Sequence, residues 1–283
     1  VATSVASIVS VSSTTPAVAG TTYKLTATTD ALTGSAGNDL VNGVLQADGA
    51  DGTTVAPGDS ISGGAGIDTL SIAVAGDIAA SANYTLAALS LTDVEKVHFS
   101  NFDTDTTYGN IVDTSLMTGL THVGLSASAA SGDTSFTNLK NIVEADMMNG
   151  SADLTVGYST AVVAGTADAQ TLNVSNLSAG TFTADGIEAI TVNGSLVAST
   201  LAGVASDAVT SLTLTGDQDL TINAATTFAV TTSTAAIAST IDASALTGAM
   251  SVLVGDTSTV KVTGGSAADT INMAATLETN DVI

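Results

Sequence analysis

Short runs in which apolar and polar residues alternate recur along most of this chain. Examples are Val94–Phe99, Ile187–Val192 and Val209–Leu214, which are rich in β-branched residues and separated by Gly, Asn or Asp. Alternation with a period of two is typical of β-strands with one buried face. Between about 78 and 262 these runs recur at a spacing of roughly 20 to 25 residues per turn, which is typical of stacked-strand coils. The pattern predicts an all-β fold, a right-handed parallel β-solenoid.

Helical patterns are nearly missing from the sequence. Leu86–Leu91 and Ala243–Leu246 could each form one helical turn at most. An internal sequence similarity between Asp113–Gly119 and Asp242–Gly248 supports a coil of repeated turns.

One segment carries a specific motif. Gly63–Ser71 matches the nine-residue pattern G-G-x-G-x-D-x-U-x, which builds a turn of a parallel β-roll around calcium. Its glycines permit backbone angles that a Cβ would forbid, so carbonyl oxygens can turn towards an ion. Asp68 supplies a hard carboxylate oxygen that suits Ca²⁺, and Leu70 starts a strand whose side chain packs inside the coil. The alternative is a generic Gly-rich hairpin turn.

Two further segments resemble this motif. Gly34–Val41 has Ser35 in place of the second glycine, and Gly264–Ile271 has Ala267 in place of the third. Aspartates recur at a spacing of nine residues around the first two copies, so their carboxylates are expected to stack along the coil. These are Asp30, Asp39 and Asp48, then Asp59, Asp68 and Asp77. Residues 49–58, between the two groups, are expected to form an extruded loop.

Composition narrows the classes of function. Aromatic residues are 3% of the 283 residues, and small or β-branched side chains dominate, which suits thin stacked strands. The formal net charge is -23, with four lysines and no arginine, so a nucleic-acid footprint is excluded and docking onto anionic lipid is disfavoured. Cations are the natural partners of this surplus of carboxylates. Cysteine is absent, so a secreted form would need bound metal in place of disulfides.

The order of these segments resembles a known family. Lys24–Gly34 leads into the first motif and Gly58–Gly64 into the second, and Thr92–Val97 and Asp113–Leu120 follow. Because paired calcium motifs are followed by a long Thr/Ala/Val-rich solenoid, the chain resembles the RTX-type bacterial surface-layer (S-layer) proteins of Caulobacter-like organisms. The resemblance is specific for residues 24–125 and 264–271. It implies an extracellular protein, exported by type I secretion, that assembles with calcium into a paracrystalline coat on the cell surface.

This pattern divides the chain into four parts. Residues 1–29 are expected to be a linker or edge strand, 30–77 an RTX β-roll with the loop insertion, 78–262 a β-solenoid, and 263–283 the start of a second RTX segment. The amino end lacks an initiator Met and a basic segment, so it is not a signal peptide, and no run of about 18 apolar residues could span a membrane. Asn280–Ile283 resembles Gly58–Ile61, which precedes the best motif, so we expect an interior piece of a longer protein.

Calcium is the expected cofactor. The main candidate ligands are aspartate carboxylates together with glycine carbonyl groups. They are Asp39, Asp59, Asp68 and Asp269, with Gly34, Gly37, Gly63, Gly64, Gly66 and Gly264. A second group has partial glycine surroundings, and a solvated turn explains it equally well. It consists of Asp30, Asp48, Asp77 and Asp281.

Catalysis has little support in the sequence. His98 and His122 are the only histidines, and neither has the neighbours of a zinc site, so each is expected to be exposed or satisfied by a partner. Asp103 and Asp105 suggest a turn or an extra cation site. The leading hypothesis is a structural S-layer protein, not an enzyme, whose partners are calcium ions and other copies of itself. The alternatives are the stalk of a large RTX adhesin and the non-catalytic portion of a secreted RTX enzyme.

Overall fold

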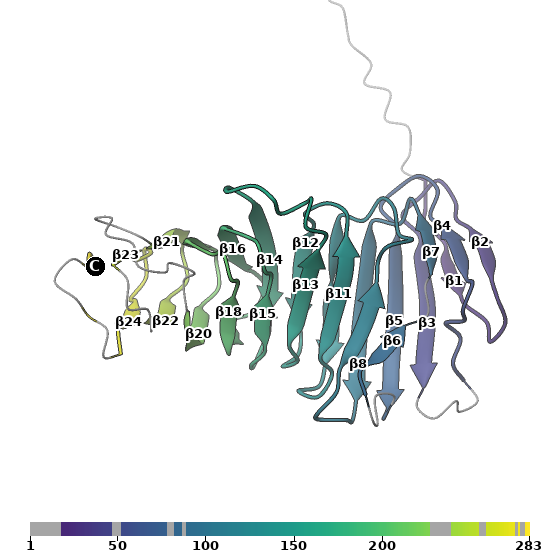
Figure 1. Ribbon diagram of the computed structural model, residues 1–283, viewed down its shortest axis with the longest axis horizontal. Helices are drawn as coiled ribbons and strands as arrows, with labels where there is room; N and C mark the ends of the chain where they lie inside the picture. The colour runs from purple at the N-terminus through teal and green to yellow at the C-terminus, as the bar shows by residue number, and fades with distance from the viewer. Residues whose placement is uncertain are drawn as a thin grey trace, which may run out of the picture.

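The chain folds into a parallel β-solenoid. The computed structural model describes residues 18–46, 52–77, 82–86, 89–226, 239–254, 259–274, 277 and 281–283. Every regular element in these ranges is a strand, no helix occurs in them, and all the strand pairings are parallel. The coil is elongated, with β1 and β2 at one end and β23 and β24 at the other (Figure 1).

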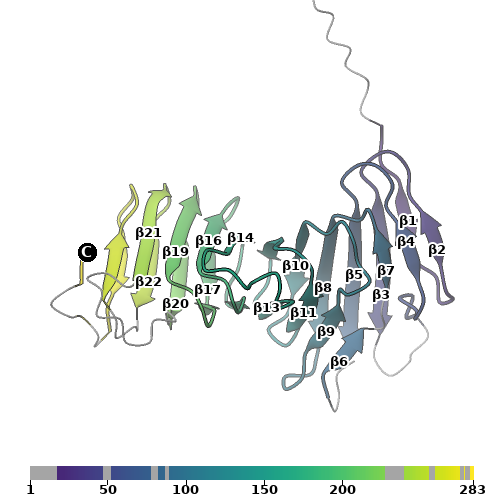
Figure 2. The ribbon, with the colours of Figure 1, turned by 45° about the horizontal axis from the view of Figure 1, so that its top comes forward.

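The largest sheet, here called the long sheet, runs the whole length of the coil (Figure 2). Its eleven strands lie in the order β1 (Thr22–Lys24), β3 (Leu40–Gln46), β5 (Thr69–Gly76), β8 (Lys96–Asp103), β10 (His122–Ser128), β12 (Glu144–Met148), β14 (Ala169–Ser175), β16 (Ala189–Gly194), β19 (Ser211–Gly216), β21 (Ser239–Leu246) and β23 (Val260–Thr263).

Three shorter sheets form the remaining sides of the coil. One has three strands, β2 (Ala31–Thr33), β4 (Ser60–Ser62) and β7 (Ser90–Thr92). A second has six, in the order β18 (Gly203–Ala205), β15 (Thr181–Thr183), β13 (Leu154–Tyr158), β11 (Thr134–Leu139), β9 (Asn110–Asp113) and β6 (Tyr84–Leu86). A third has four, β17 (Ser199–Leu201), β20 (Leu220–Thr226), β22 (Met250–Val254) and β24 (Thr270–Asn272).

Apolar alternation places the core inside the coil. In β5 the side chains of Leu70, Ile72 and Val74 are buried, while those between them are more exposed. Register then stacks these positions, since Leu70 pairs with Val97 and Ile72 with Phe99. Equivalent pairings continue along the long sheet, so each inward residue covers the one before it. The three alternating runs expected from the sequence are confirmed as β8, β16 and β19.

The few large side chains bridge the interior. Phe99 of the long sheet and Phe136 of the six-stranded sheet meet edge to face, with ring centroids 5.8 Å apart. Both are fully buried. Such aromatic pairs contribute about 0.5–1.5 kcal/mol beyond the area they bury.

The coil length differs from turn to turn. The amide of Asp68, directly before β5, donates to Glu95 at a sequence separation of 27, whereas that of Asp168, directly before β14, donates to Glu188 at a separation of 20. The spacing of 20 to 25 residues expected for about 78–262 is therefore confirmed at Asp168, but longer turns also occur in that range, such as the 29 residues between Ser211 and Thr240. The expected helical turn at Ala243–Leu246 is wrong, because these residues belong to β21. The other expected helical turn begins in β6 and ends in β7, with 87–88 outside the described residues.

The segment expected to be an extruded loop folds back where the structure describes it, from residue 52 onward. Val55 is buried, and its Cγ2 fills the space that a β-carbon on Gly43 would need. The amide of Thr54 donates to the carbonyl oxygen of Val44 at 2.8 Å. Gly43 thus makes room on β3 for an apolar residue of the loop, which the sequence pattern did not indicate.

Candidate functional site: stacked glycine corners

The first two motif copies lie on top of one another at one edge of the long sheet. The first corner, Gly34–Asp39, connects β2 to β3, and the second corner, Gly63–Asp68, connects β4 to β5. Oδ1 of Asp68 accepts a hydrogen bond of 2.6 Å from the backbone amide of Asp39, at a sequence separation of 29. The two aspartates therefore form one column along the coil axis.

The glycines of these corners leave space that oxygen atoms fill. A β-carbon built on Gly34 would overlap the carbonyl oxygen of Gly63 and Oδ2 of Asp39. A β-carbon built on Gly63 would likewise overlap the carbonyl oxygen of Asp93 and Oδ2 of Asp68. At each corner, one carboxylate oxygen and one carbonyl oxygen of the next coil thus converge on the same small space. Both are acceptors, so neither can satisfy the other.

Asp39 and Asp68 differ in how their carboxylates are satisfied. Asp39 accepts hydrogen bonds from the amide of Thr21 (2.6 Å) and from the amide and hydroxyl of Ser35. The Thr21 bond is the largest effect on the pKa of Asp39 and, together with the Ser35 bonds, it outweighs burial and lowers that pKa. Oδ2 of Asp68, in contrast, is buried and has no hydrogen-bond donor among the described residues. A buried carboxylate oxygen without a donor is costly unless a cation lies against it.

These corners have the right chemistry for calcium. Carboxylate and backbone carbonyl oxygens are the hard ligands that Ca²⁺ takes. No three His, Cys, Asp or Glu side chains gather into a metal-binding group in the part of the chain that the structure describes. An ion held at these corners would therefore draw much of its coordination from carbonyl groups, as the motif predicts. When bound, it would neutralise Asp68 and join the acceptors of successive coils.

Asp30 does not stack on Asp39, nor does Asp59 stack on Asp68, contrary to the sequence-based expectation. Asp30 precedes β2 and Asp39 precedes β3, so they occupy different corners of one coil. The contact that exists again spans a sequence separation of 29, because the amide of Asp30 donates to Oδ1 of Asp59 at 2.9 Å. Asp59 is fully buried, and its Oδ2 accepts from the amide of Ala56. In this second column the Asp59 carboxylate is satisfied by backbone amides, and no copy of the glycine motif lies there.

The third copy is far from the other two. Gly264–Asp269 connects β23 to β24, at the opposite end of the coil in Figure 1. It leaves the long sheet, whereas the first two corners enter it. Asp269 accepts from the amides of Met250 (2.9 Å) and Gly265 (2.7 Å). As Asp39 does in the first copy, Asp269 accepts a hydrogen bond from an amide of its own turn. At this distance it cannot share an ion with Asp39 or Asp68.

The remaining candidates have separate positions. Asp281 accepts from the amide of Val260 at 2.9 Å, next to the third copy. Asp77 follows β5 at the end of the strand opposite to Asp68. Asp48 lies outside the described residues. Asp103 and Asp105 form a turn, in which Oδ1 of Asp105 accepts from the amides of Thr107 and Tyr108.

Two residues at the same edge were missed in the sequence. Asp93 has φ of 51°, and its carbonyl oxygen faces Gly63. Glu95 accepts from the amide of Asp68 at 2.7 Å, which continues the column that Asp39 and Asp68 begin. The only signal was an acidic pair beside an alternating run, in a segment without the glycines that define the motif.

Both histidines are satisfied by carboxylates, as expected of structural residues. Nε2 of His98 lies 2.8 Å from Oδ2 of Asp146, and Nε2 of His122 lies 3.3 Å from Oε2 of Glu144. These acids come from β12, so their proximity was not visible in the sequence. The histidines thus hold neighbouring strands together on the outer face of the long sheet.

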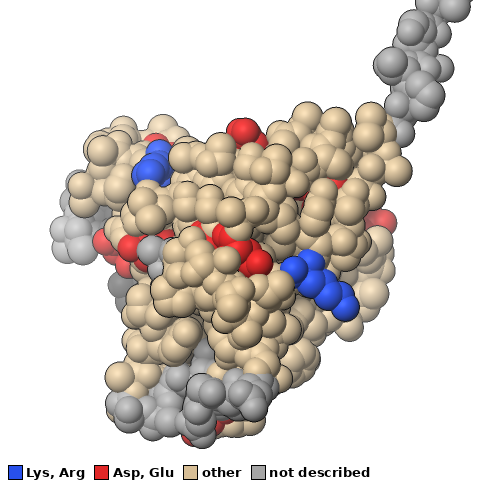
Figure 3. All heavy atoms as spheres, turned by 90° about the vertical axis from the view of Figure 1, so that its right-hand side faces the viewer, with Lys and Arg blue, Asp and Glu red and all other residues tan. Residues whose placement is uncertain are grey.

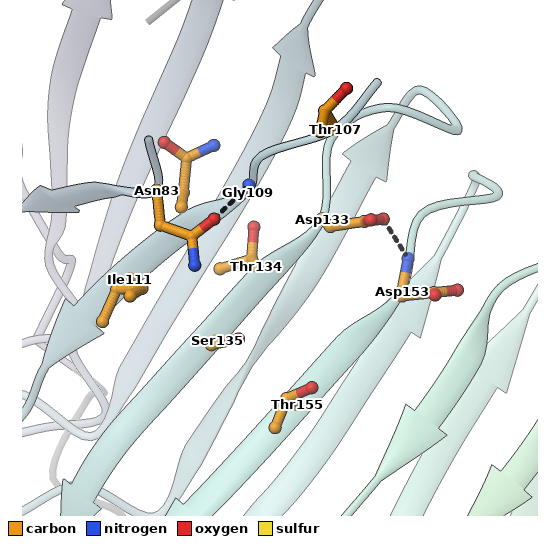
Figure 4. Close-up of a pocket in the computed structure, with 10 residues that line it drawn as sticks. Asn83, Thr107, Gly109, Ile111, Asp133, Thr134, Ser135, Asp153 and Thr155 are labelled. Atoms are coloured by element: carbon orange, nitrogen blue, oxygen red, sulfur yellow. Dashed lines mark hydrogen bonds between the residues drawn. The ribbon is translucent and has the colours of Figure 1, made fainter. Parts of the chain in front are cut away.

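A shallow cavity of about 260 Å³ lies on the six-stranded sheet (Figure 4). Its carboxylates serve the backbone: Asp133 accepts from the amide of Asp153 at 2.9 Å, and Asp153 accepts from that of Thr181 at 2.6 Å. Burial, reinforced by the charge of Asp153, raises the pKa of Asp133. Hydroxyl groups of Thr107, Thr134 and Ser135 contribute to the lining, and none of its residues is basic.

Comparison with known proteins gives the chain no family. No protein-family model matches this sequence, and no curated protein is significantly similar to it. Among the described residues, none forms a helix long and apolar enough to cross a membrane.

Proposed function

We propose that this protein is a calcium-stabilised structural solenoid that assembles into an extracellular surface layer. One observation carries the proposal. At two stacked corners, a buried aspartate oxygen and a carbonyl oxygen of the next coil converge on a space that only glycine leaves open. At the second corner, that aspartate oxygen, Oδ2 of Asp68, has no donor in the described structure. A divalent cation satisfies both acceptors at once.

Calcium binding would act on folding and on assembly through charge. The net charge of -23 makes close packing of copies repulsive, and divalent cations relieve that repulsion. At the end of the coil that carries β1 and β2, small patches of Asp and Glu lie on a largely uncharged surface with few lysines (Figure 3). Extracellular calcium modules bind at about 10⁻⁴ to 10⁻³ M, so the sites would fill outside the cell.

The resemblance to RTX-type surface-layer proteins supports the rest of this proposal. The chain would be exported by type I secretion, would lie at the cell surface, and would contact other copies of itself in a two-dimensional lattice. Anchoring to the cell would depend on a region outside this chain. The role is structural, and no catalytic residue is assigned.

The elongated coil in Figure 1 favours a second candidate, the stalk of a large RTX adhesin. A stalk would stiffen with calcium in the same way but would remain a single rod. Electron microscopy of purified protein with calcium separates the two, because a surface-layer protein forms sheets and a stalk forms isolated rods.

Calcium-dependent thermal unfolding tests the proposal, with Asp68→Asn as the main variant. Asparagine keeps one oxygen for the amide of Asp39 and removes the unpaired anionic oxygen. A site with a dissociation constant of about 10⁻⁴ to 10⁻³ M adds about 1.4–2.7 kcal/mol of stability at about 10 mM calcium. The matched control is Asp217→Asn, because Asp217 is exposed and outside the corners.

We expect calcium to raise the melting temperature of the wild type and of Asp217→Asn by the same amount, and that of Asp68→Asn by less. An unchanged melting temperature and circular dichroism spectrum of the wild type, in calcium and in excess EGTA, would refute calcium stabilisation.

A further inference from the structure

The third coil closes the column of corners without the motif. Strand register aligns Ser62 with Thr92 and Thr69 with Lys96, so the glycine turn of the second corner faces a shorter turn. This third corner is Asp93–Glu95, and it contains no glycine. Asp93 has φ of 51°, a left-handed conformation that non-glycine residues adopt uncommonly. Asp93 therefore has a backbone conformation that is more usual for glycine.

That bend aims a carbonyl group at the second corner. The carbonyl oxygen of Asp93 and Oδ2 of Asp68 both overlap the position of a β-carbon on Gly63. Asp68 is 1% exposed, so water reaches this oxygen poorly, and no donor among the described residues serves it. Two acceptors that meet in a buried space require a cation or a donor between them.

A second carboxylate contacts the backbone of Asp68. Glu95 is half-buried, and its Oε2 accepts from the amide of Asp68 at 2.7 Å. It therefore occupies, relative to Asp68, the position that Asp68 occupies relative to Asp39. Neither Asp68 nor Glu95 forms an ion pair with a lysine or histidine in the described part of the chain.

We propose that a calcium ion binds between the second and third corners, held by Oδ2 of Asp68, the carbonyl oxygen of Asp93 and the carboxylate of Glu95. The inference rests on the proposed function, because it assumes that the corners take calcium. It adds that a corner without glycine completes the site at the second corner, with Glu95 as the ligand that no motif identifies.

The chain contains a matched control for Glu95. Glu188 contacts Asp168 in the same way: its Oε2 accepts from the amide of Asp168 at 2.8 Å, and the carbonyl oxygen of Asp168 accepts from the amides of Glu188 and Ala189. The carbonyl oxygen of Asp68 likewise accepts from the amides of Glu95 and Lys96. Oδ2 of Asp168, however, has a donor, the amide of Gly165 at 3.2 Å. The backbone contact is the same, but only Glu95 contacts a residue that has an unsatisfied carboxylate oxygen.

The test compares Glu95→Gln with Glu188→Gln. Glutamine keeps an oxygen for the backbone amide in both variants, so both should have similar stability in EGTA. Calcium binding is measured by isothermal titration, and calcium-dependent melting is measured in parallel. We expect Glu188→Gln to match the wild type and Glu95→Gln to bind one calcium ion fewer, or that ion at least tenfold more weakly. Should Glu95→Gln not fold, Glu95→Asp and Glu188→Asp shorten both side chains equally and allow the same comparison.

Each result has a distinct meaning. Equal calcium stoichiometry and affinity in the Glu95 and Glu188 variants would overturn the third-corner site. If Asp68→Asn weakened binding in the same experiment, the proposed function would survive that result. Absence of calcium binding by the wild type would instead remove the proposed function and this inference together.

Discussion

The imidazole of His98 reaches across one strand to the carboxylate of Asp146, with Nε2 2.8 Å from Oδ2, although the two residues are 48 positions apart in sequence. Gly124 lies between them in the register of β8, β10 and β12. Since glycine has no side chain, the imidazole can extend over it. Asn173 of β14 donates to Oδ1 of Asp146 at 3.0 Å, so the contact joins four neighbouring strands of the long sheet.

Asp146 predicts a loss of stability in acid. Burial acts to raise its pKa, but hydrogen bonds from His98 and Asn173, with the charges of His98 and His122, lower it below the ordinary 3.8. A lowered carboxylate pKa contributes stability above the ordinary value, which is lost as the pH falls through the folded-state pKa. Asp146→Asn should lose about 1–3 kcal/mol of unfolding free energy at pH 7.

Urea unfolding at pH 7 and near pH 3 measures this effect. The gap between wild type and Asp146→Asn should narrow in acid, and Asp217→Asn should stay close to wild type at both pH values. A gap of constant size would mean that the ionised form of Asp146 is not what stabilises the fold.

One strand offers a direct comparison of inner and outer aromatic side chains. In β8, Phe99 is buried against Phe136, whereas Phe102 is 51% exposed. Phe99→Ala removes a ring from a packed interior and should cost about 3–5 kcal/mol. Phe102→Ala should change stability by less than about 0.5 kcal/mol. Chemical denaturation of both variants checks this, and comparable losses would argue against the inward register of β8.

Gly63 should be intolerant of a side chain even without calcium. Its β-carbon would overlap the carbonyl oxygen of Asp93, so Gly63→Ala must displace a neighbouring coil, at about 1–3 kcal/mol or more. Gly157 is the control, because the nearest atom to its β-carbon position is 3.3 Å away. Gly157→Ala should stay within about 1 kcal/mol of wild type. Melting curves in EGTA compare the two variants. Equal stability would show that the second corner has room for a β-carbon at Gly63.

Tyr158 predicts a loss of stability in alkali. Burial raises its pKa well above the ordinary 10.0, and its hydroxyl donates to Oε1 of Gln170 at 2.6 Å. A raised pKa contributes stability that is present below the ordinary value and is lost as the pH rises beyond it. Tyr158→Phe should cost about 0.5–1.5 kcal/mol at pH 7. Urea unfolding near pH 7 and pH 11 should show the difference shrinking, and a widening difference would contradict the assignment.

Local features of the fold could be predicted from the sequence. The runs containing Ile190 and Leu212 alternate, so their strands and buried faces were identified correctly. The similarity between the segments at Asp113 and Asp242 also corresponds to a shared local hydrogen bond, because each aspartate accepts from the amide two residues later at 2.9 Å. Yet Asp113 ends a strand of the six-stranded sheet and Asp242 lies within a strand of the long sheet. Such a local hydrogen bond is set by neighbouring residues, whereas the choice of sheet depends on the whole coil.

The candidate site was predicted in part for the same reason. Gly63 and Asp68 were identified because their spacing follows a fixed pattern, and both lie at the second corner. Asp93 and Glu95 were not, because their role depends on a coil that contacts Asp68 only after folding. The expected stacking of Asp30 over Asp39 was wrong because the contact between successive coils here spans a sequence separation of 29.

By itself, the sequence determined which segments become strands, which side chains face inward and where glycine turns bend the chain, since these depend on residues within a few positions. Only the tertiary structure decided which corners share an edge and which acids meet. The sequence separation between contacts of successive coils is 29 at Asp39 and 20 at Asp168, so the partner of each residue depends on the whole coil rather than on a local pattern.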